Sequence, residues 1–322
     1  MNQKLTVSPS PHLMTSRGTR AIMLDVIIAL APTAIASAVI FGPRTLAVIA
    51  LTVFSSVLAE YLFNLILKRP CTVGDCSAAV TGLILALNLP SEIPLWLCVL
   101  GAVIAIVAVK GLFGGLGQNF ANPALTARIV LFLSFSKAMS AVGTPNFTDA
   151  VSSATPLSAP ESELPSLLDM FLGLRGGMLG ETCAVTLILG GIYLIIRKVI
   201  TWHTPVAFIG TLFLLSLAVG ENPFYAVLSG GLLLGAIYMA TDYATTPITW
   251  GGRLIFGAGC GLITFLIRTF GSYPEGVSFA ILFMSLLTPY IDELTRPHPV
   301  GSPRRRDPFK KRTGGESKKA GG

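Results

Sequence analysis

The sequence predicts an all-α polytopic membrane protein with about ten transmembrane helices in two five-helix halves. Only 12% of its 322 residues are charged and 52% are hydrophobic, whereas a soluble domain carries roughly 25% charged residues. The mean hydropathy is +0.72. Apolar runs recur at lengths close to the about 20 residues that cross a bilayer as a helix. Helices are the expected form because backbone polar groups inside lipid must be satisfied within the segment.

The candidate spans follow one another along most of the chain. The polar N-terminal segment 1–20 precedes an apolar run longer than the hydrophobic region of a signal peptide, so we expect the first span to be retained. The third span is the weakest, because it is short and ends at Pro90. In chain order the spans are 21–41, 45–67, 78–90, 94–113, 124–140, 178–196, 205–220, 223–241, 254–270 and 276–295.

The distribution of lysine and arginine predicts the orientation, because cytoplasmic loops of membrane proteins are enriched in both. With both termini in the cytoplasm, the cytoplasmic loops and tail contain all 23 basic residues except Arg44, Lys137, Arg175 and Arg268. The expected order is a cytoplasmic segment, a first transmembrane half, an extracytoplasmic loop, a second transmembrane half and a basic cytoplasmic tail. These parts occupy 1–20, 21–140, 141–177, 178–295 and 296–322.

The tail and the cysteines indicate little chemistry. The tail is rich in Pro, Gly, Lys and Arg, a composition typical of disorder. We expect it to set the topology or to be attracted to anionic headgroups of the lipid bilayer, and we expect no nucleic acid as a partner.

The five cysteines are scattered, and the nearest pair, Cys71 and Cys76, is not a CxxC. Neither a metal site nor a disulfide framework is indicated.

Acidic residues near the spans are candidates for function. Ionisable groups at membrane depth are costly, although caps or snorkelling explain those near helix ends. Glu60 lies well inside the second span, so it is the first candidate for ion coupling, with a structural role as the alternative. The other acids near spans are Asp25, Asp75, Glu181 and Asp242.

Two polar segments with Gly and Pro, 114–128 and 240–253, lie in cytoplasmic connections. Broken or re-entrant helices at such positions often line a site, and simple loops are the alternative. The first contains "GGLGQNFANPAL", whose glycines permit close backbone approach. Its amides supply hydrogen-bond donors and acceptors, whereas tight helix packing with a turn is the structural alternative. The spacing is not a dinucleotide fingerprint.

The outer loop contains the stretch "DAVSSATPL" at 149–157. Thr155 precedes Pro156, which favours an extended backbone for the threonine. Its hydroxyl would then be accessible for modification, although Ser/Thr/Pro loops are common and composition alone makes this a weak signal.

This stretch resembles the D-G-x-[S/T]-x-A-T acceptor sequence of flavinylated membrane subunits. These are the D subunit of Rnf electron-transport complexes and the related B subunit of the sodium-pumping NADH:quinone reductase. The resemblance implies a covalent FMN, which a flavin transferase joins through its phosphate to the Thr155 hydroxyl. Asp149, Ser152 and Ala154 match the rest of the motif, and Ala150 replaces its glycine.

The resemblance covers most of the chain. It includes "DCSAAVTGLILALNLP" at 75–90, "KGLFGGLGQNFANPA" at 110–124 and the segment 252–292. The short N-terminus and compact outer loop fit the Rnf D subunit better than the quinone-reductase B subunit. It also implies a second, noncovalent flavin, riboflavin in the quinone-reductase relative, which we expect near 241–247 and the set Gly117, Gln118, Asn119 and Asn122.

The resemblance implies a flavoprotein subunit of a translocase in the bacterial or archaeal cytoplasmic (inner) membrane. Such a complex carries electrons between ferredoxin and NAD and couples this to Na+ or H+ movement. The expected partners are other membrane subunits, an extracytoplasmic flavin subunit and cytoplasmic NAD and iron–sulfur subunits. The chain would not be active alone. The rival hypotheses are a secondary transporter without flavin, a purely structural subunit, and a B-type subunit of the quinone reductase.

Overall fold

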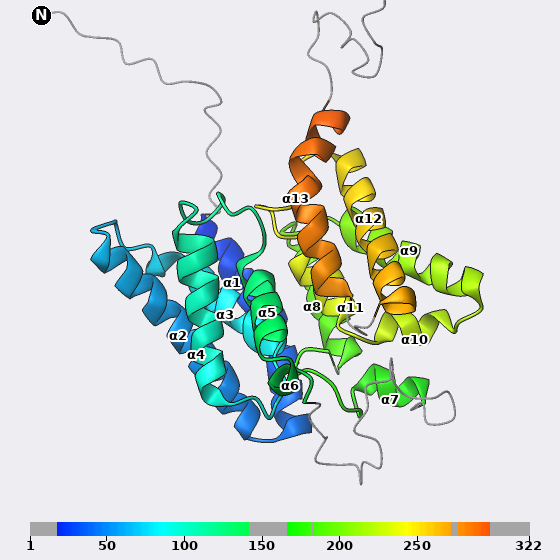
Figure 1. The fold of residues 1–322 in the computed structure, drawn as a ribbon, viewed down its shortest axis with the longest axis horizontal. Helices are drawn as coiled ribbons and strands as arrows, with labels where there is room; N and C mark the ends of the chain where they lie inside the picture. The colour runs from blue at the N-terminus through cyan, green and yellow to red at the C-terminus, as the bar shows by residue number, and fades with distance from the viewer. Residues whose placement is uncertain (1–17, 142–165, 182, 272–275, 297–322) are drawn as a thin grey trace, which may run out of the picture.

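The computed structural model describes residues 18–141, 166–181, 183–271 and 276–296 (Figure 1). Within these ranges all regular elements are helices, as the all-α prediction requires. Four helices are long and apolar enough to cross a membrane: α1 (Thr19–Phe41), α2 (Arg44–Ile66), α12 (Trp250–Phe270) and α13 (Val277–Thr295). They coincide with the first, second, ninth and tenth predicted spans.

The other predicted spans contain shorter helices, so a count of ten membrane crossings does not follow from helix length. Spans three to seven contain α3 (Ser77–Leu87), α4 (Leu95–Val103) with the π-helix η2 (Ile104–Gly111), α5 (Pro123–Ser134) with α6 (Ser136–Met139), α8 (Ala184–Ile196) and α9 (His203–Val219). In the sixth predicted span, the helix α8 begins later than predicted. The residues before α8 instead pair with the end of α3, where the Gly180 N–H donates to the Leu87 carbonyl at 2.6 Å.

The eighth predicted span, 223–241, is not one helix. It contains α10 (Pro223–Leu228), α11 (Leu232–Leu234) and the π-helix η4 (Gly235–Met239). Gly230 and Gly231, with φ of 63° and 65°, separate α10 from α11. Glycine adopts this left-handed backbone without the penalty other residues pay. The predicted interruptions at 114–128 and 240–253 are non-helical connections over 112–122 and 240–249, and no re-entrant helix is assigned there.

The third span of each predicted half contains strongly buried helices, although α10 has no buried residue. Nine of the eleven residues of α3 are buried, as are all residues of α11 and η4. A helix enclosed by protein does not need to match the bilayer thickness, and its broken backbone can be satisfied by neighbours. This burial explains why these elements are short although their sequence is strongly apolar.

The two sets of helices meet through equivalent members. In Figure 1, α1 to α6 lie on the left and α7 to α13 on the right. Helices α2, α3, α4 and η2 pack together, as do α9, α12 and α13. Contact between the sets includes α1 against α8 and α5 against α13, which are the first and last spans of each predicted half.

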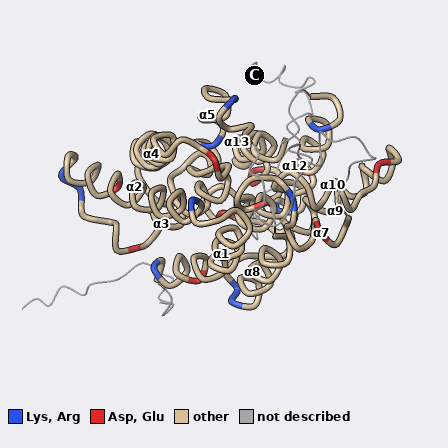
Figure 2. The backbone as a smooth tube through the Cα atoms, turned by 90° about the horizontal axis from the view of Figure 1, so that it is seen from below, with Lys and Arg blue, Asp and Glu red and all other residues tan. Residues whose placement is uncertain are grey.

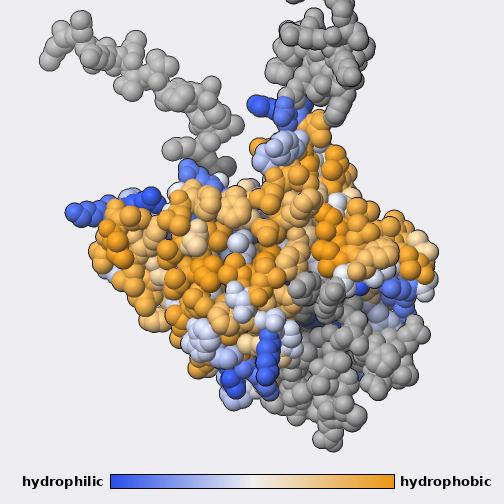
Figure 3. Space-filling model, in the orientation of Figure 1, coloured by the Kyte–Doolittle hydropathy of each residue, from blue (hydrophilic) through white to orange (hydrophobic). Residues whose placement is uncertain are grey.

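The start of α1 and the end of α13 lie at the same end of the molecule, together with the connection 112–122 (Figure 1). Helices α6 and α7 (Leu167–Leu172), which precede and follow the segment 142–165, lie at the opposite end. A broad hydrophobic band lies between these ends (Figure 3). Charged residues are few along the described backbone (Figure 2). This surface is that of a multi-pass membrane protein.

The contact between α1 and α8 combines an ion pair with close backbone approach. The Arg197 guanidinium donates to the Asp25 carboxylate at 3.1 Å, and the Tyr193 hydroxyl donates to the same carboxylate at 2.9 Å. Further along α8, a Cβ on Gly190 would overlap the Ala29 carbonyl and the Tyr238 hydroxyl. Glycine is therefore required at position 190 for α1 to approach α8.

We expect Gly190→Ala to lower the thermal unfolding midpoint of the detergent-purified protein. A Cβ at position 190 would overlap both a backbone carbonyl and the Tyr238 hydroxyl, so the cost of overpacking should exceed the about 1 kcal/mol that alanine gains over glycine within a helix. Gly210→Ala in α9 is the matched control, because a Cβ there meets nothing within 4 Å. An equal midpoint for the two variants would contradict this account of the α1–α8 contact.

Candidate functional site

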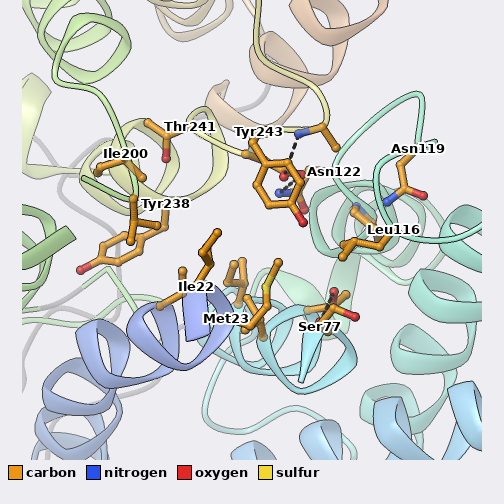
Figure 4. Close-up of a pocket in the computed structure, with 18 of the residues that line it drawn as sticks. Ile22, Met23, Ser77, Leu116, Asn119, Asn122, Ile200, Tyr238, Thr241 and Tyr243 are labelled. Carbon is orange, nitrogen blue, oxygen red and sulfur yellow. Dashed lines mark hydrogen bonds between the residues drawn. The ribbon is translucent and has the colours of Figure 1, made fainter. Parts of the chain in front are cut away.

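A pocket of about 90 Å³ lies between the two sets of helices, at the same end as the start of α1 (Figure 4). Its walls come from α1, the start of α3, the connection 112–122, residues 199–200 and the segment 238–244. The two connections that the sequence placed near a second flavin therefore meet here. Each of these connections directly follows a π-helix: η2 ends at Gly111, and η4 ends at Met239.

Asn122 is the central polar residue of the pocket. It caps α5, because its side-chain oxygen accepts from the Ala124 and Leu125 N–H groups at 3.1 and 3.3 Å. Its side-chain amide donates to the Asp242 carboxylate at 3.5 Å, which joins the two connections. Burial raises the pKa of Asp242 to about 6. Asn122 and Tyr243 both line the cavity (Figure 4).

Asn119 lines the same pocket, and its side-chain oxygen is buried without a hydrogen-bond partner. A buried acceptor left unpaired is costly, so a ligand donor at this position would be stabilising. Gly117 and Gln118 do not line this cavity. Gln118 is exposed and turns back toward Gly114. Of the predicted set, the structure therefore brings together only Asn119 and Asn122.

The pocket suits the polar edge of a flavin better than it suits the whole ring system. Asn119 and Asn122 supply amide groups, and Tyr238 and Tyr243 supply aromatic surface. However, the volume of about 90 Å³ is below the roughly 300 Å³ at which ligand pockets usually begin. A flavin ring would therefore sit partly in the opening of the pocket.

Glu60 lies in a buried network beside this pocket. Its carboxylate accepts from the Lys110 ammonium at 2.7 Å and from the Thr72 hydroxyl at 2.9 Å. Lys110 also donates to the Ser77 hydroxyl at 2.5 Å, and Ser77 donates to Asp75 at 2.5 Å. Glu60 and Lys110 are 5% and 4% exposed. The structure thus confirms that Glu60 is buried inside its helix, while ion coupling remains a prediction.

The other acids have structural partners. Asp75 accepts from the Ser77 N–H at 2.8 Å at the start of α3. Glu181 accepts from Arg128 at 3.5 Å, and Arg128 also donates to Ser278 at 2.7 Å.

The sequence analysis missed the importance of Lys110, which it counted only as a cytoplasmic charge. Its place at the end of an apolar run was the available signal, because lysine is rare at membrane depth.

The predicted flavin-acceptor residues lie outside the described part of the chain. They are Asp149, Ser152, Ala154 and Thr155.

The sequence model of the NQR2, RnfD, RnfE family matches residues 6–301. The D subunit of the Na+-translocating ferredoxin:NAD+ oxidoreductase complex of Acetobacterium woodii is 46% identical, over 92% of this chain and 95% of the relative. The D subunit of the proton-translocating ferredoxin:NAD+ oxidoreductase complex of Clostridium ljungdahlii is 40% identical, over 93% and 97%. The D subunit of an ion-translocating oxidoreductase complex of Escherichia coli is 35% identical, over 92% and 98%.

We expect Asn122→Ala to destabilise the protein more than Asn222→Ala. Both asparagines cap a helix that begins with proline, and loss of a cap costs about 1 kcal/mol. Asn122 is buried and also contacts Asp242, whereas Asn222 is exposed. Thermal unfolding of the purified variants measures the difference. Equal losses would show that the contact between the two connections contributes nothing.

Proposed function

The chain belongs to the NQR2, RnfD, RnfE family, and on this premise we propose that it is the D subunit of an Rnf-type ion-translocating oxidoreductase complex. Such a complex carries electrons between ferredoxin and NAD+ and couples their transfer to the movement of Na+ or H+. The observation that carries the proposal is the 46% identity to a D subunit over 92% of this chain. The chain is then one part of an enzyme complex and acts together with the other Rnf subunits.

The proposed redox group is FMN, joined through its phosphate to the Thr155 hydroxyl by a flavin transferase. The acceptor motif supports this assignment, with Asp149, Ser152 and Ala154 matching and Ala150 departing from it. When bound, FMN supplies one- and two-electron redox chemistry that protein side chains lack. A covalent link to Thr155 would keep the group from being lost to the medium.

The proposed orientation places both termini in the cytoplasm of a cell with a cytoplasmic (inner) membrane. The basic residues Lys68 and Arg69 follow α2 at the end of the molecule where α1 begins. Cytoplasmic loops are enriched in such residues. Helices α6 and α7, which flank the segment that contains Thr155 in the sequence, then lie on the outer side.

The pocket lined by Asn119 and Asn122 is the proposed place of a second, noncovalent flavin, riboflavin by analogy with the quinone-reductase B subunit. The amide and aromatic side chains of its walls and the unpaired Asn119 oxygen support it. In this proposal the chain's residues position the ring edge, and part of the ring extends beyond the enclosed volume.

Glu60 is the proposed ion-coupling residue. It is a carboxylate buried within α2 and paired with Lys110. Relatives are named as Na+-translocating and as proton-translocating, so membership of the family does not select one ion. The rival hypotheses remain a secondary transporter without flavin and a B-type quinone-reductase subunit. Detection of covalent flavin would count against the transporter.

We expect Thr155→Ala to abolish covalent flavin in protein expressed in its native host. In-gel flavin fluorescence after denaturation, and the mass of the peptide that contains Thr155, measure attachment. Ser153→Ala is the control, because it lies at a position that the acceptor motif leaves free and retains the Thr155 hydroxyl, so it should retain the flavin. An unmodified wild-type peptide would remove the flavin proposal, and fluorescence retained in Thr155→Ala would place the acceptor at another residue.

We expect Ser158→Cys to react with a membrane-impermeant thiol reagent added to intact cells. The exposed native Cys71 follows Lys68 and Arg69 and should react only after the cells are opened. Mass spectrometry of the two peptides separates the sites. Labelling in the reverse order would invert the proposed orientation.

A further inference from the structure

A second cavity, of about 310 Å³, lies beside Glu60. Its walls come from α2, the connection 69–75, η2 and the glycine turn that follows η2. Oxygen-bearing side chains line it, in the set Glu60, Asn64, Thr72 and Asp75. Such oxygens are the ligands that hard metal cations prefer.

One carboxylate oxygen in this wall has no partner. Glu60 Oε1 accepts from Lys110 and Thr72, whereas Glu60 Oε2 is buried and has no hydrogen-bond partner. An unpaired charged oxygen in a residue that is only 5% exposed carries a large desolvation cost. The cavity offers the space in which a cation could satisfy it.

Lys110 supplies the positive charge that Glu60 requires. Its side chain lines both this cavity and the pocket lined by Asn119 and Asn122. Ser77, which accepts from Lys110, lines the Asn122 pocket, and Asp75, which accepts from Ser77, lines the Glu60 cavity. These side chains therefore form the wall between the two cavities.

A second basic residue lines the Glu60 cavity but does not neutralise the carboxylate. Arg69 is exposed, and its guanidinium donates to the Gly111 carbonyl at 3.3 Å. The same group lies 5.7 Å from the centre of the Phe63 ring. Arg69 is thus held at the edge of the cavity by other contacts.

We propose that the cavity beside Glu60 is a binding site for a monovalent cation of the size of Na+. The Lys110 ammonium pairs with the Glu60 carboxylate when no such cation is bound. This inference rests on the proposed function, in which Glu60 couples ion movement, and it specifies where the ion would bind. When Na+ enters, Lys110 turns from Glu60 toward the neighbouring pocket. One positive charge replaces another at Glu60, so the exchange never leaves a buried carboxylate uncompensated.

The test measures thermal unfolding of the full chain in detergent as NaCl replaces choline chloride at constant ionic strength. Choline is too large to sit among these oxygens, so it reports salt effects alone. Lys110→Met removes the competing ammonium and keeps a side chain of similar length. We expect it to strengthen the apparent Na+ affinity by about tenfold or more, because close charge pairs couple at this strength or above. Lys137→Met, at an exposed lysine of α6, should leave the wild-type response unchanged.

Glu60→Gln should abolish the Na+ response, both alone and combined with Lys110→Met. An Na+ response in Lys110→Met no stronger than in wild type, or an Na+ response that survives Glu60→Gln, would overturn the proposal. Glu60 and Lys110 would then be a structural ion pair.

If Lys110→Met does not accumulate, Ser77→Ala takes its place, because it removes one hydrogen bond that holds Lys110. An Na+ response in Ser77→Ala no stronger than in wild type would then count against the site. The measurement requires neither flavin nor partner subunits, so its failure leaves the flavin proposal intact.

Discussion

A charge inside a low-dielectric core has to find its partner within the protein, and this constraint joins segments that are distant in the sequence. Asp25 pairs with Arg197 across the two sets of helices. Glu181 pairs with Arg128 across the same boundary, and Glu60 pairs with Lys110 between α2 and η2. Removing one member of such a pair leaves an uncompensated charge. These contacts therefore fix which helices are neighbours, whereas the apolar surfaces between them are much less selective.

The positions of most helices could be predicted from the sequence, because apolar runs of the right length are a local signal. Nothing local predicted that Lys110 would face Glu60, since their pairing depends on how two separate elements pack. The break at Gly230 and Gly231 was also missed, because the apolar pattern continues on both sides of it. Asn119 and Asn122 line a pocket together with Thr241 to Ala244, whereas Gln118 lies outside it. A stretch of amides in the sequence does not show which of them face inward.

The Asn122 pocket and the Glu60 cavity lie at the same end of the molecule. Asn122, Asp242 and the Glu60–Lys110 pair lie at the end where α1 begins. Helices α6 and α7 lie at the other end. The proposed cation site beside Glu60 adjoins the pocket proposed for a second flavin, and Lys110 lines both cavities, so added negative charge in that pocket would act on Lys110 directly.

The π-helical geometry of η2 has a consequence for how the sequence can change. In an α-helix each residue turns the chain by about 100°, and a π-helix turns it less because its hydrogen bonds reach one residue further. Lys110 is the seventh of eight such residues, so its direction depends on the wider turn of the residues before it. Loss of a single residue upstream would swing the ammonium around the helix axis and away from Glu60. The length of this element is therefore under tighter restraint than its composition, and variation among homologues should appear as exchanged apolar side chains and not as insertions or deletions.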